Sequence, residues 1–131
     1  MIEHDTVSIL VENNSKILLI KRKNNPEQSY WAVPGGHVEE NEGFSKAAQR
    51  EANEEVGGVE ITSEKSIFTY THNAAVGKKH NDHVFNGKAI GEIRAASDAE
   101  EVKWFSLEEM KDMNITNYTR IIINKMFGDK L

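Results

Sequence analysis

Three glutamates, Glu51, Glu54 and Glu55, lie close together in a stretch whose apolar residues recur at helical spacing. On a helix with about 100° per residue, Glu51 and Glu55 fall on the apolar side and Glu54 falls at its edge. Clustered, partly desolvated carboxylates are costly unless a positive charge offsets them. Because Mg²⁺ takes oxygen ligands and binds carboxylates together with substrate phosphates, the pattern predicts a cation site for a phosphate-bearing substrate. The apolar side of this helix consists of Phe44, Ala47, Ala48, Ala52 and Val56.

The residues around the glutamates support this interpretation. Arg50 is the nearby base in the helix, and one guanidinium can offset at most one of the three carboxylates. The helical wheel directs Arg50 toward water, on the same side as Lys46, Gln49 and Asn53. The preceding Gly35-Gly36 pair supplies backbone carbonyls and no side chains, so it permits close approach of a metal or a substrate.

The net charge of the chain is concentrated around the same glutamates. The 131 residues carry 16 Lys and Arg against 21 Asp and Glu, a formal net charge of −5 at pH 7. Residues 39–60 hold seven acids and two bases, and the rest of the chain carries equal numbers of each. This balance disfavours binding of nucleic acids or of anionic membranes, which depends on basic patches.

Apolar runs and turn residues predict the elements that position the glutamates. Residues 6–11 and 16–22 are expected to form an antiparallel hairpin, and residues 30–33 a short strand that ends at Pro34. The acidic helix is expected over residues 44–56, with Gly57-Gly58 as its C-terminal stop.

The second half of the chain continues the alternation of strands and helices. Residues 59–71 and 83–93 are expected to be strands separated by a polar loop, and residues 101–105 a last short strand. Ser106 to Glu109 fits a capping box that opens a helix, and apolar residues from Tyr118 to Met126 recur at helical spacing. The order predicts one α+β domain over residues 1–131, an α/β/α sandwich with a mixed sheet flanked by helices.

Composition excludes several other classes of protein. The absence of cysteine excludes a disulfide scaffold, a thiolate zinc site and a cysteine nucleophile. The longest apolar run, residues 17–20, is far shorter than the roughly 18 residues that a membrane span needs. Glu3, His4 and Asp5 stand where a signal peptide would need basic and apolar residues. We therefore expect a cytoplasmic protein without membrane contact.

The acidic helix and the glycine turn together resemble the signature of a known enzyme family. Gly36, Glu42 and the run from Arg50 to Gly57 match the Nudix box of the MutT-like Nudix hydrolases, G-x5-E-x7-R-E-U-x-E-E-x-G-U, where U is a bulky apolar residue. The resemblance extends to the segments Trp31-Ala32-Val33-Pro34 and Trp104-Phe105-Ser106-Leu107. Two positions depart from the box: Ala52 is a small version of the first U, and Gly58 occupies the last. Both departures affect packing at the helix rather than the carboxylates.

The resemblance implies the Nudix fold and hydrolysis of a nucleoside diphosphate linked to a further group. It implies Mg²⁺ or Mn²⁺ as the cofactor, bound by Glu51, Glu54, Glu55 and the carbonyl of Gly35. Glu51, Glu54 and Arg50 would be the catalytic residues, with Arg50 orienting a carboxylate, directly or through Glu42. Bound metals would offset the charge of the pyrophosphate, lower the pKa of a water and align it for attack on phosphorus.

Further residues are candidates for supporting roles. Some family members use an additional acid late in the chain, and Asp98, Glu100 and Glu101 precede Trp104 suitably. Arg22, Gly36 and His37 are candidates for substrate binding, although a solvated strand end is an equally good interpretation of Arg22. His72, His80 and His83 match no trusted zinc spacing and could contact substrate instead. Core packing is the better interpretation of Trp31 and Tyr30 than stacking on a base.

The substrate is the least determined feature of the sequence. The proline that follows the box in ADP-ribose enzymes of the family is absent, because the two prolines are Pro26 and Pro34. The markers of the diadenosine polyphosphate, NADH and coenzyme A hydrolases are also missing. Elimination therefore favours a MutT-like (deoxy)nucleoside triphosphatase. A non-catalytic nucleotide-binding sensor is the main alternative, an RNA 5′-end pyrophosphohydrolase is a weaker one, and a homodimer is left open.

Overall fold

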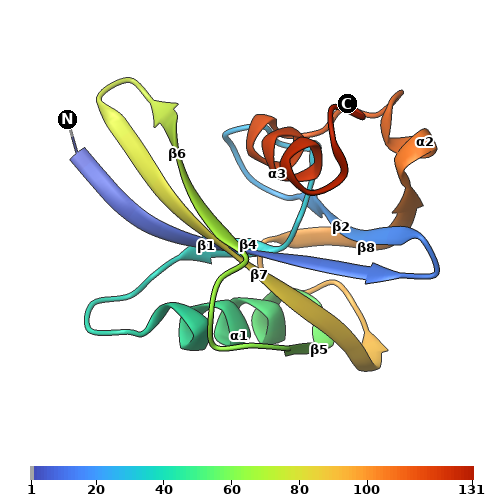
Figure 1. Ribbon diagram of the computed structural model, residues 1–131, viewed down its shortest axis with the longest axis horizontal. Helices are drawn as coiled ribbons and strands as arrows, with labels where there is room; N and C mark the ends of the chain where they lie inside the picture. The colour runs from blue at the N-terminus through green and yellow to red at the C-terminus, as the bar shows by residue number, and fades with distance from the viewer. Residues whose placement is uncertain (1) are drawn as a thin grey trace.

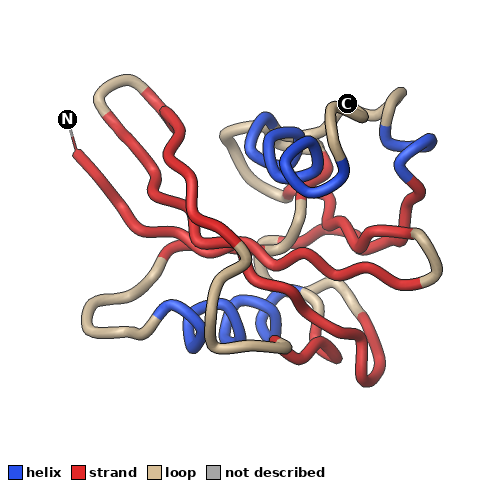
Figure 2. Tube along the Cα trace, viewed as in Figure 1, coloured by secondary structure: helices blue, strands red, loops and turns tan. Residues whose placement is uncertain are grey.

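A single mixed sheet organises the computed structural model, which describes residues 2–131 (Figures 1 and 2). Its strands are β1 (Ile2–Asn13), β2 (Lys16–Arg22), β3 (Trp31–Ala32), β4 (Gly35–His37), β5 (Gly57–Ile61), β6 (Phe68–Ala75), β7 (Lys78–Ile93) and β8 (Ala99–Ser106). The helices are α1 (Phe44–Glu55), α2 (Leu107–Met110) and α3 (Asn117–Phe127). β1 lies between β2, to which it is antiparallel, and β7, to which it is parallel. The predicted α+β class is confirmed.

The sheet separates two hydrophobic cores, because successive side chains of a strand point to opposite faces. Val7, Ile9 and Val11 of β1 pack with the alanines of α1 on one face. Leu10 of β1 packs with Ile122 and Ile123 of α3 on the other. Helices therefore cover both faces (Figure 1), as expected for an α/β/α sandwich.

The predicted β1–β2 hairpin is confirmed, and its turn explains the loop sequence. Asn14 and Ser15 both have positive φ, 51° and 63°. Two consecutive residues with positive φ form the tight turn whose twist matches antiparallel strands. The turn places β1 in the middle of the sheet, where it pairs with β2, β4 and β7.

The predicted acidic helix is also confirmed, and glycines explain its end. Gly57 has a φ of +79° and the chain leaves the helix there to begin β5. At Gly58, an added Cβ would lie 2.7 Å from the carbonyl oxygen of Gly91 and closer still to its carbonyl carbon. A bulky residue at this position, as in the usual box, would collide with β7. The departure at Gly58 thus permits close packing of β5 on β7.

Two residues of α1 differ from the helical-wheel expectation. Phe44 is 40% exposed and stacks on the ring of His83, because the first residue of the helix lies beyond the edge of the core. Gln49, expected to face water, donates to Val59 O and accepts from Ile61 N, at 2.9 Å each. Its side chain thereby attaches α1 to β5, an interaction that a wheel of an isolated helix cannot reveal.

The predictions for residues 59–82 were partly wrong. Residues 59–71 are not one strand, because β5 ends at Ile61 and β6 begins at Phe68. Most of the expected polar loop, residues 72–82, belongs to the β6–β7 hairpin, whose tip lies near Gly77. The tip of the hairpin extends away from α1 and α3 (Figure 1). Polar side chains are tolerated in these strands because backbone hydrogen bonds to β1 and within the hairpin maintain them.

The C-terminal predictions are confirmed. Ser106 caps α2 with a complete capping box: its side chain accepts from Glu109 N, and Glu109 Oε1 accepts from Ser106 N. The amphipathic helix is α3, which buries Ile122 and Ile123. Trp31 packs edge to face on Phe105 at 4.9 Å, as its core interpretation required, whereas the core interpretation of Tyr30 is wrong, because its side chain is exposed. Within residues 2–131, no helix has the length and apolar character needed to cross a membrane.

Candidate functional site

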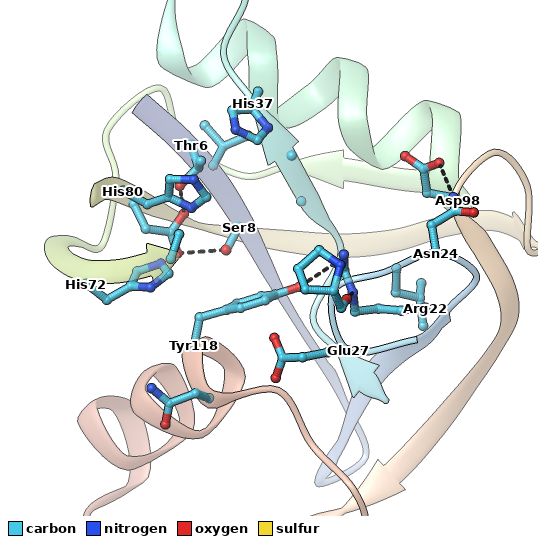
Figure 3. Close-up of a pocket in the computed structure, with 18 of the residues that line it drawn as sticks. Thr6, Ser8, Arg22, Asn24, Glu27, His37, His72, His80, Asp98 and Tyr118 are labelled. Carbon is cyan, nitrogen blue, oxygen red and sulfur yellow. Dashed lines mark hydrogen bonds between the residues drawn. The ribbon is translucent and has the colours of Figure 1, made fainter. Parts of the chain in front are cut away.

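A cavity of about 540 Å³ lies beside the acidic end of α1. Its lining comes from the sheet strands β1, β4, β6 and β7, from the loop after β2, and from the first turn of α3. Figure 3 shows two facing sides, with His37, His72 and His80 on one and Arg22, Asn24 and Asp98 on the other. Elements far apart in the sequence therefore converge on one hollow.

Glu55 is the buried carboxylate of this cavity. The last residue of α1 is only 3% exposed, and its Oε1 accepts a hydrogen bond of 2.9 Å from Gly35 N. Burial raises the pKa of Glu55 to about 8, and the nearby Glu51 and Asp98 act in the same direction. The Gly35 N–H opposes the shift without cancelling it. Glu55 therefore lacks enough positive charge around it to remain a stable anion.

Glu51 lies one helical turn before Glu55 and depends on the glycine turn for its space. Its side chain is 12% exposed, and its Oε1 accepts a hydrogen bond of 2.9 Å from Arg50 Nη1. Burial raises the pKa of Glu51 despite this bond. A Cβ built on Gly36 would lie 2.6 Å from Glu51 Oε2 and closer to its other carboxyl atoms. A side chain at position 36 would therefore displace the Glu51 carboxylate from its present position.

Arg50 contacts more acids than the sequence suggested. Its guanidinium donates to both oxygens of Glu42, at 2.8 and 2.9 Å, and to Glu51. Its Nη1 also lies 3.4 Å from Glu54, whose side chain is 47% exposed, and its Nε lies 3.1 Å from Glu39. The hydrogen bonds from Arg50 lower the pKa of Glu42 to about 2. The single positive charge of Arg50 is therefore shared among four carboxylates, and Glu55 is not one of them.

The three late acids occupy different environments. Asp98 lines the cavity, and its Oδ1 accepts a hydrogen bond of 3.2 Å from Asn24 Nδ2. Glu101 instead pairs with Lys21 at 3.3 Å and Lys103 at 3.5 Å, and Glu100 is exposed. Of the three late acids, only Asp98 lies near the α1 carboxylates. It directly precedes β8, whereas Glu100 and Glu101 belong to that strand.

The three substrate-binding candidates all line the cavity. Arg22 is the only lysine or arginine among the lining residues that the structure describes. Its Nε donates to Pro26 O at 2.9 Å, and its Nη1 lies 3.5 Å from Tyr118 Oη. Gly36 and His37 belong to β4, which pairs with β1 at Val7 and Thr6. Arg22 is thus the cation available to a bound phosphate group.

The histidines of the predicted polar loop divide between two faces of the sheet. His72 and His80 line the cavity. His83 lies on the other face, where it stacks on Phe44 and contacts Thr69 and Asp5 at 3.1 Å each. Among residues 2–131, no group of three or more His, Asp or Glu side chains is arranged to hold a metal ion as the side chains stand. This applies to the three histidines and to the glutamates of α1 alike.

Sequence reasoning missed Asp82, a buried acid of the cavity. Asp82 is 2% exposed and accepts hydrogen bonds from Thr6 Oγ1 at 2.9 Å and Ser8 Oγ at 2.8 Å. The polar composition of residues 77–82 predicts a loop, and in a loop the directions of successive side chains do not alternate regularly. The signal was the alternation of His80, Asp82 and Val84, which is typical of one face of a strand.

The family model of the NUDIX domain matches residues 2–124. A curated ADP-ribose pyrophosphatase of Methanocaldococcus jannaschii is 35% identical in an alignment of 115 residues that covers 82% of this chain. The chain spans 65% of the length of that relative.

Solved structures agree on the fold. A MutT NUDIX hydrolase from Burkholderia pseudomallei is 30% identical, with a TM-score of 0.84, over 95% of this chain and 98% of that one. A bifunctional NMN adenylyltransferase/ADP ribose pyrophosphatase from Francisella tularensis, complexed with AMP and a Mn ion, is 28% identical with a TM-score of 0.80. It aligns over 99% of this chain and 42% of its own length. The resemblance of the sequence to Nudix hydrolases is thereby confirmed, and the chain belongs to the NUDIX domain family.

Proposed function

We propose that this protein hydrolyses the pyrophosphate bond of a nucleoside diphosphate sugar of the ADP-ribose type, with Mg²⁺ or Mn²⁺ as cofactor. The observation that carries the proposal is the burial of Glu55 at the cavity beside Glu51 and Asp98. Buried acids without matching positive charge are costly in a folded protein. Such a cost is retained where the acids have a ligand to bind.

The donor set fits a hard divalent cation. Glu51, Glu54 and Glu55 supply carboxylate oxygens, and the carbonyl of Gly35 supplies another oxygen nearby, the chemistry that Mg²⁺ and Mn²⁺ prefer. Glu51 and Glu54 face Arg50 as the side chains stand, so binding requires small rotations of flexible side chains. The cation would neutralise charge on the pyrophosphate and activate a water.

The chain's own residues then have separable tasks. Arg22 would hold the substrate phosphates through charge-assisted hydrogen bonds. Arg50 would fix Glu51 by the bond it already makes. Water attack on one phosphorus would break the bond to the bridging oxygen and give a nucleoside monophosphate and a sugar phosphate. Asp98, hydrogen-bonded by the neutral Asn24, keeps lone pairs for the proton that the water releases.

The choice of a nucleotide sugar departs from the sequence-based elimination. Elimination favoured a (deoxy)nucleoside triphosphatase because the proline marker of the ADP-ribose enzymes is absent. Two relatives that carry the words ADP-ribose pyrophosphatase in their names support the other choice. The presence of Arg22 as the one lysine or arginine described in the cavity lining also favours a substrate with two phosphates over one with three.

A substrate panel tests the proposal. With Mg²⁺, we expect kcat/KM for ADP-ribose to exceed that for ATP and dGTP by about 10-fold or more, a difference of about 1.4 kcal/mol in transition-state binding. Chelation of the metal should abolish turnover. A higher kcat/KM for the triphosphates would return the assignment to a MutT-like triphosphatase. Tight binding of ADP-ribose without turnover of any nucleotide would instead support the non-catalytic sensor.

Gly36→Ala should reduce activity through Glu51. The added methyl would occupy the space of the Glu51 carboxylate, so we expect kcat/KM to fall by about 10- to 100-fold, as when a metal ligand loses its orienting partner. The matched control is Gly43→Ala, because nothing lies within 4 Å of a Cβ at that position. Steady-state kinetics should show near wild-type activity for the control. Equal activity of the two variants would contradict a role for the position of Glu51.

A further inference from the structure

Four strands bring polar side chains together on the face of the sheet that α3 partly covers. In the register of these strands, His4 of β1 pairs with His80 of β7, which also pairs with His72 of β6. One row further on, Thr6 of β1 pairs with Asp82 of β7 and with His37 of β4. We call His37, His72, His80 and Asp82, which all line the cavity, the histidine wall.

The rings of the histidine wall contact one another edge to face. The centroids of His37 and His80 are 5.1 Å apart with an interplanar angle of 85°, and those of His72 and His80 are 5.3 Å apart, also at 85°. In an edge-to-face pair, the edge of one ring points at the face of the other, and the three rings also line the cavity. A neutral imidazole offers one N–H donor and one acceptor nitrogen, so the wall offers both kinds of partner.

The charge of the histidine wall is unsuited to phosphate. Burial and the neighbouring histidines lower the pKa of His80 to about 4, so this ring is neutral at pH 7. Asp82 adds a carboxylate that Thr6 and Ser8 hold in place. The arginine of the cavity, Arg22, lies on the opposite side (Figure 3). A group that binds to the histidine wall should therefore be uncharged and rich in hydrogen-bonding atoms.

The position of the histidine wall relative to the glutamates divides the cavity. Gly35 and Gly36 contact Glu55 and Glu51 respectively, and His37 follows them directly in β4. The other side of the cavity is formed by Arg22 with Asn24 to Glu27, and by Asp98. The pyrophosphate of a substrate would bind at the glutamates. One half of that substrate would then lie against the histidine wall, and the other half against the opposite side of the cavity.

We propose that the histidine wall binds the sugar that is linked to the distal phosphate, through hydrogen bonds to its hydroxyl groups. Each sugar hydroxyl both donates and accepts, which matches the donor and acceptor nitrogens of the imidazoles; Asp82, whose oxygens already accept from Thr6 and Ser8, supports the wall from beneath. The nucleoside half then lies toward residues 24–27. This inference rests on the proposed function, because it assigns a subsite for the substrate named there.

The direct test follows the ring protons of the histidines by NMR while ribose 5-phosphate is added in the presence of Mg²⁺. We expect the signals of His72 and His80, assigned from the variants His72→Ala and His80→Ala, to shift with one saturable binding curve. The signal of His83, on the other face of the sheet, should stay unchanged. Absence of any shift at His72 and His80 would overturn the subsite. This measurement needs no turnover, so it remains decisive if the proposed hydrolysis fails.

Product inhibition then identifies which half of the substrate the histidine wall binds. In His72→Ala and His80→Ala, we expect the inhibition constant of ribose 5-phosphate and KM for ADP-ribose to rise about 10-fold, the loss of one or two good hydrogen bonds. The inhibition constant of AMP should change by less than about 2-fold. His83→Ala is the matched control and should resemble the wild type. A rise for AMP alone would place the nucleoside at the wall and overturn the inference.

Discussion

Replacing Glu55 by glutamine is expected to remove most of the hydrolytic activity while it stabilises the metal-free fold. The loss of kcat should exceed about 10²-fold, because losing only an orienting partner of a metal ligand costs about 10- to 100-fold. The fold should tolerate the change, since a glutamine oxygen can still accept the hydrogen bond from Gly35 N. Above pH 8 the variant should be more stable than the wild type, because it removes a buried charge.

The matched control for this variant is Glu60→Gln. Glu60 lies on β5 with its side chain exposed, so the substitution makes the same chemical replacement of a carboxyl by an amide away from the cavity. Steady-state kinetics and urea unfolding of both variants separate the two effects. Wild-type activity in Glu55→Gln would remove this residue from the proposed metal ligands. Equal loss of activity in Glu60→Gln would show that overall charge, rather than the site, is responsible.

The second large effect is a pH dependence of stability that is present without metal and absent with it. Without metal, the free energy of unfolding should fall by about 2 kcal/mol between pH 6.5 and 8. The cause is Glu55, whose pKa is raised from 4.5 to about 8. With millimolar Mg²⁺ or Mn²⁺ the fall should vanish, because the cation binds the ionised carboxylates and stabilises the folded state.

The sign follows from proton counts. Between pH 4.5 and 8, the folded state holds a proton on Glu55 that the unfolded state has lost, so stability decreases as the pH rises. His80 acts in the opposite direction below pH 6.5, because its pKa is lowered to about 4. His37, whose pKa is also lowered by burial, acts like His80, and both partly offset the glutamate until the unfolded-state imidazoles have lost their protons, so the glutamate dominates in the upper part of the window. Glu42, with a pKa of about 2, contributes only in acid.

Thermal or urea unfolding at several pH values checks this prediction, with Glu55→Gln as the internal control. The variant should show a flat profile between pH 6.5 and 8 and a smaller response to metal. A wild-type protein whose stability rises across this window without metal would contradict the raised pKa. No change in melting temperature at millimolar metal would contradict the proposed metal site itself.

The local elements could be predicted because their signals are local. The hairpin of β1 and β2, the helix α1 and the capping box of α2 each depend on residues within a few positions of one another. The wheel also placed Glu51 and Glu55 on the buried side of α1 correctly, because helical geometry alone sets that direction. The cluster of acids in the candidate site was therefore visible in the sequence.

The errors concern residues whose environment is supplied by distant strands. His80 and Asp82 were assigned to a loop because they are polar, yet parallel pairing with β1 makes them part of β7. Arg50 contacts Glu42, as the family resemblance implied, but it also contacts Glu39, which the sequence did not indicate. The sequence could not distinguish Asp98 from Glu100 and Glu101, because the choice depends on the start of β8 lying beside the cavity.

The family, the mixed sheet with its flanking helices, and the helix that carries Glu51 and Glu55 on its buried side could all be predicted from the sequence. These features follow from short-range spacing, which a chain of 131 residues displays directly. Tertiary contacts were needed to show that Asp98 lies near Glu55, that Arg22 lines the cavity, and that histidines from three strands form one wall. Such groupings depend on sheet pairing between residues as far apart as Thr6 and Asp82, and no local pattern encodes that register.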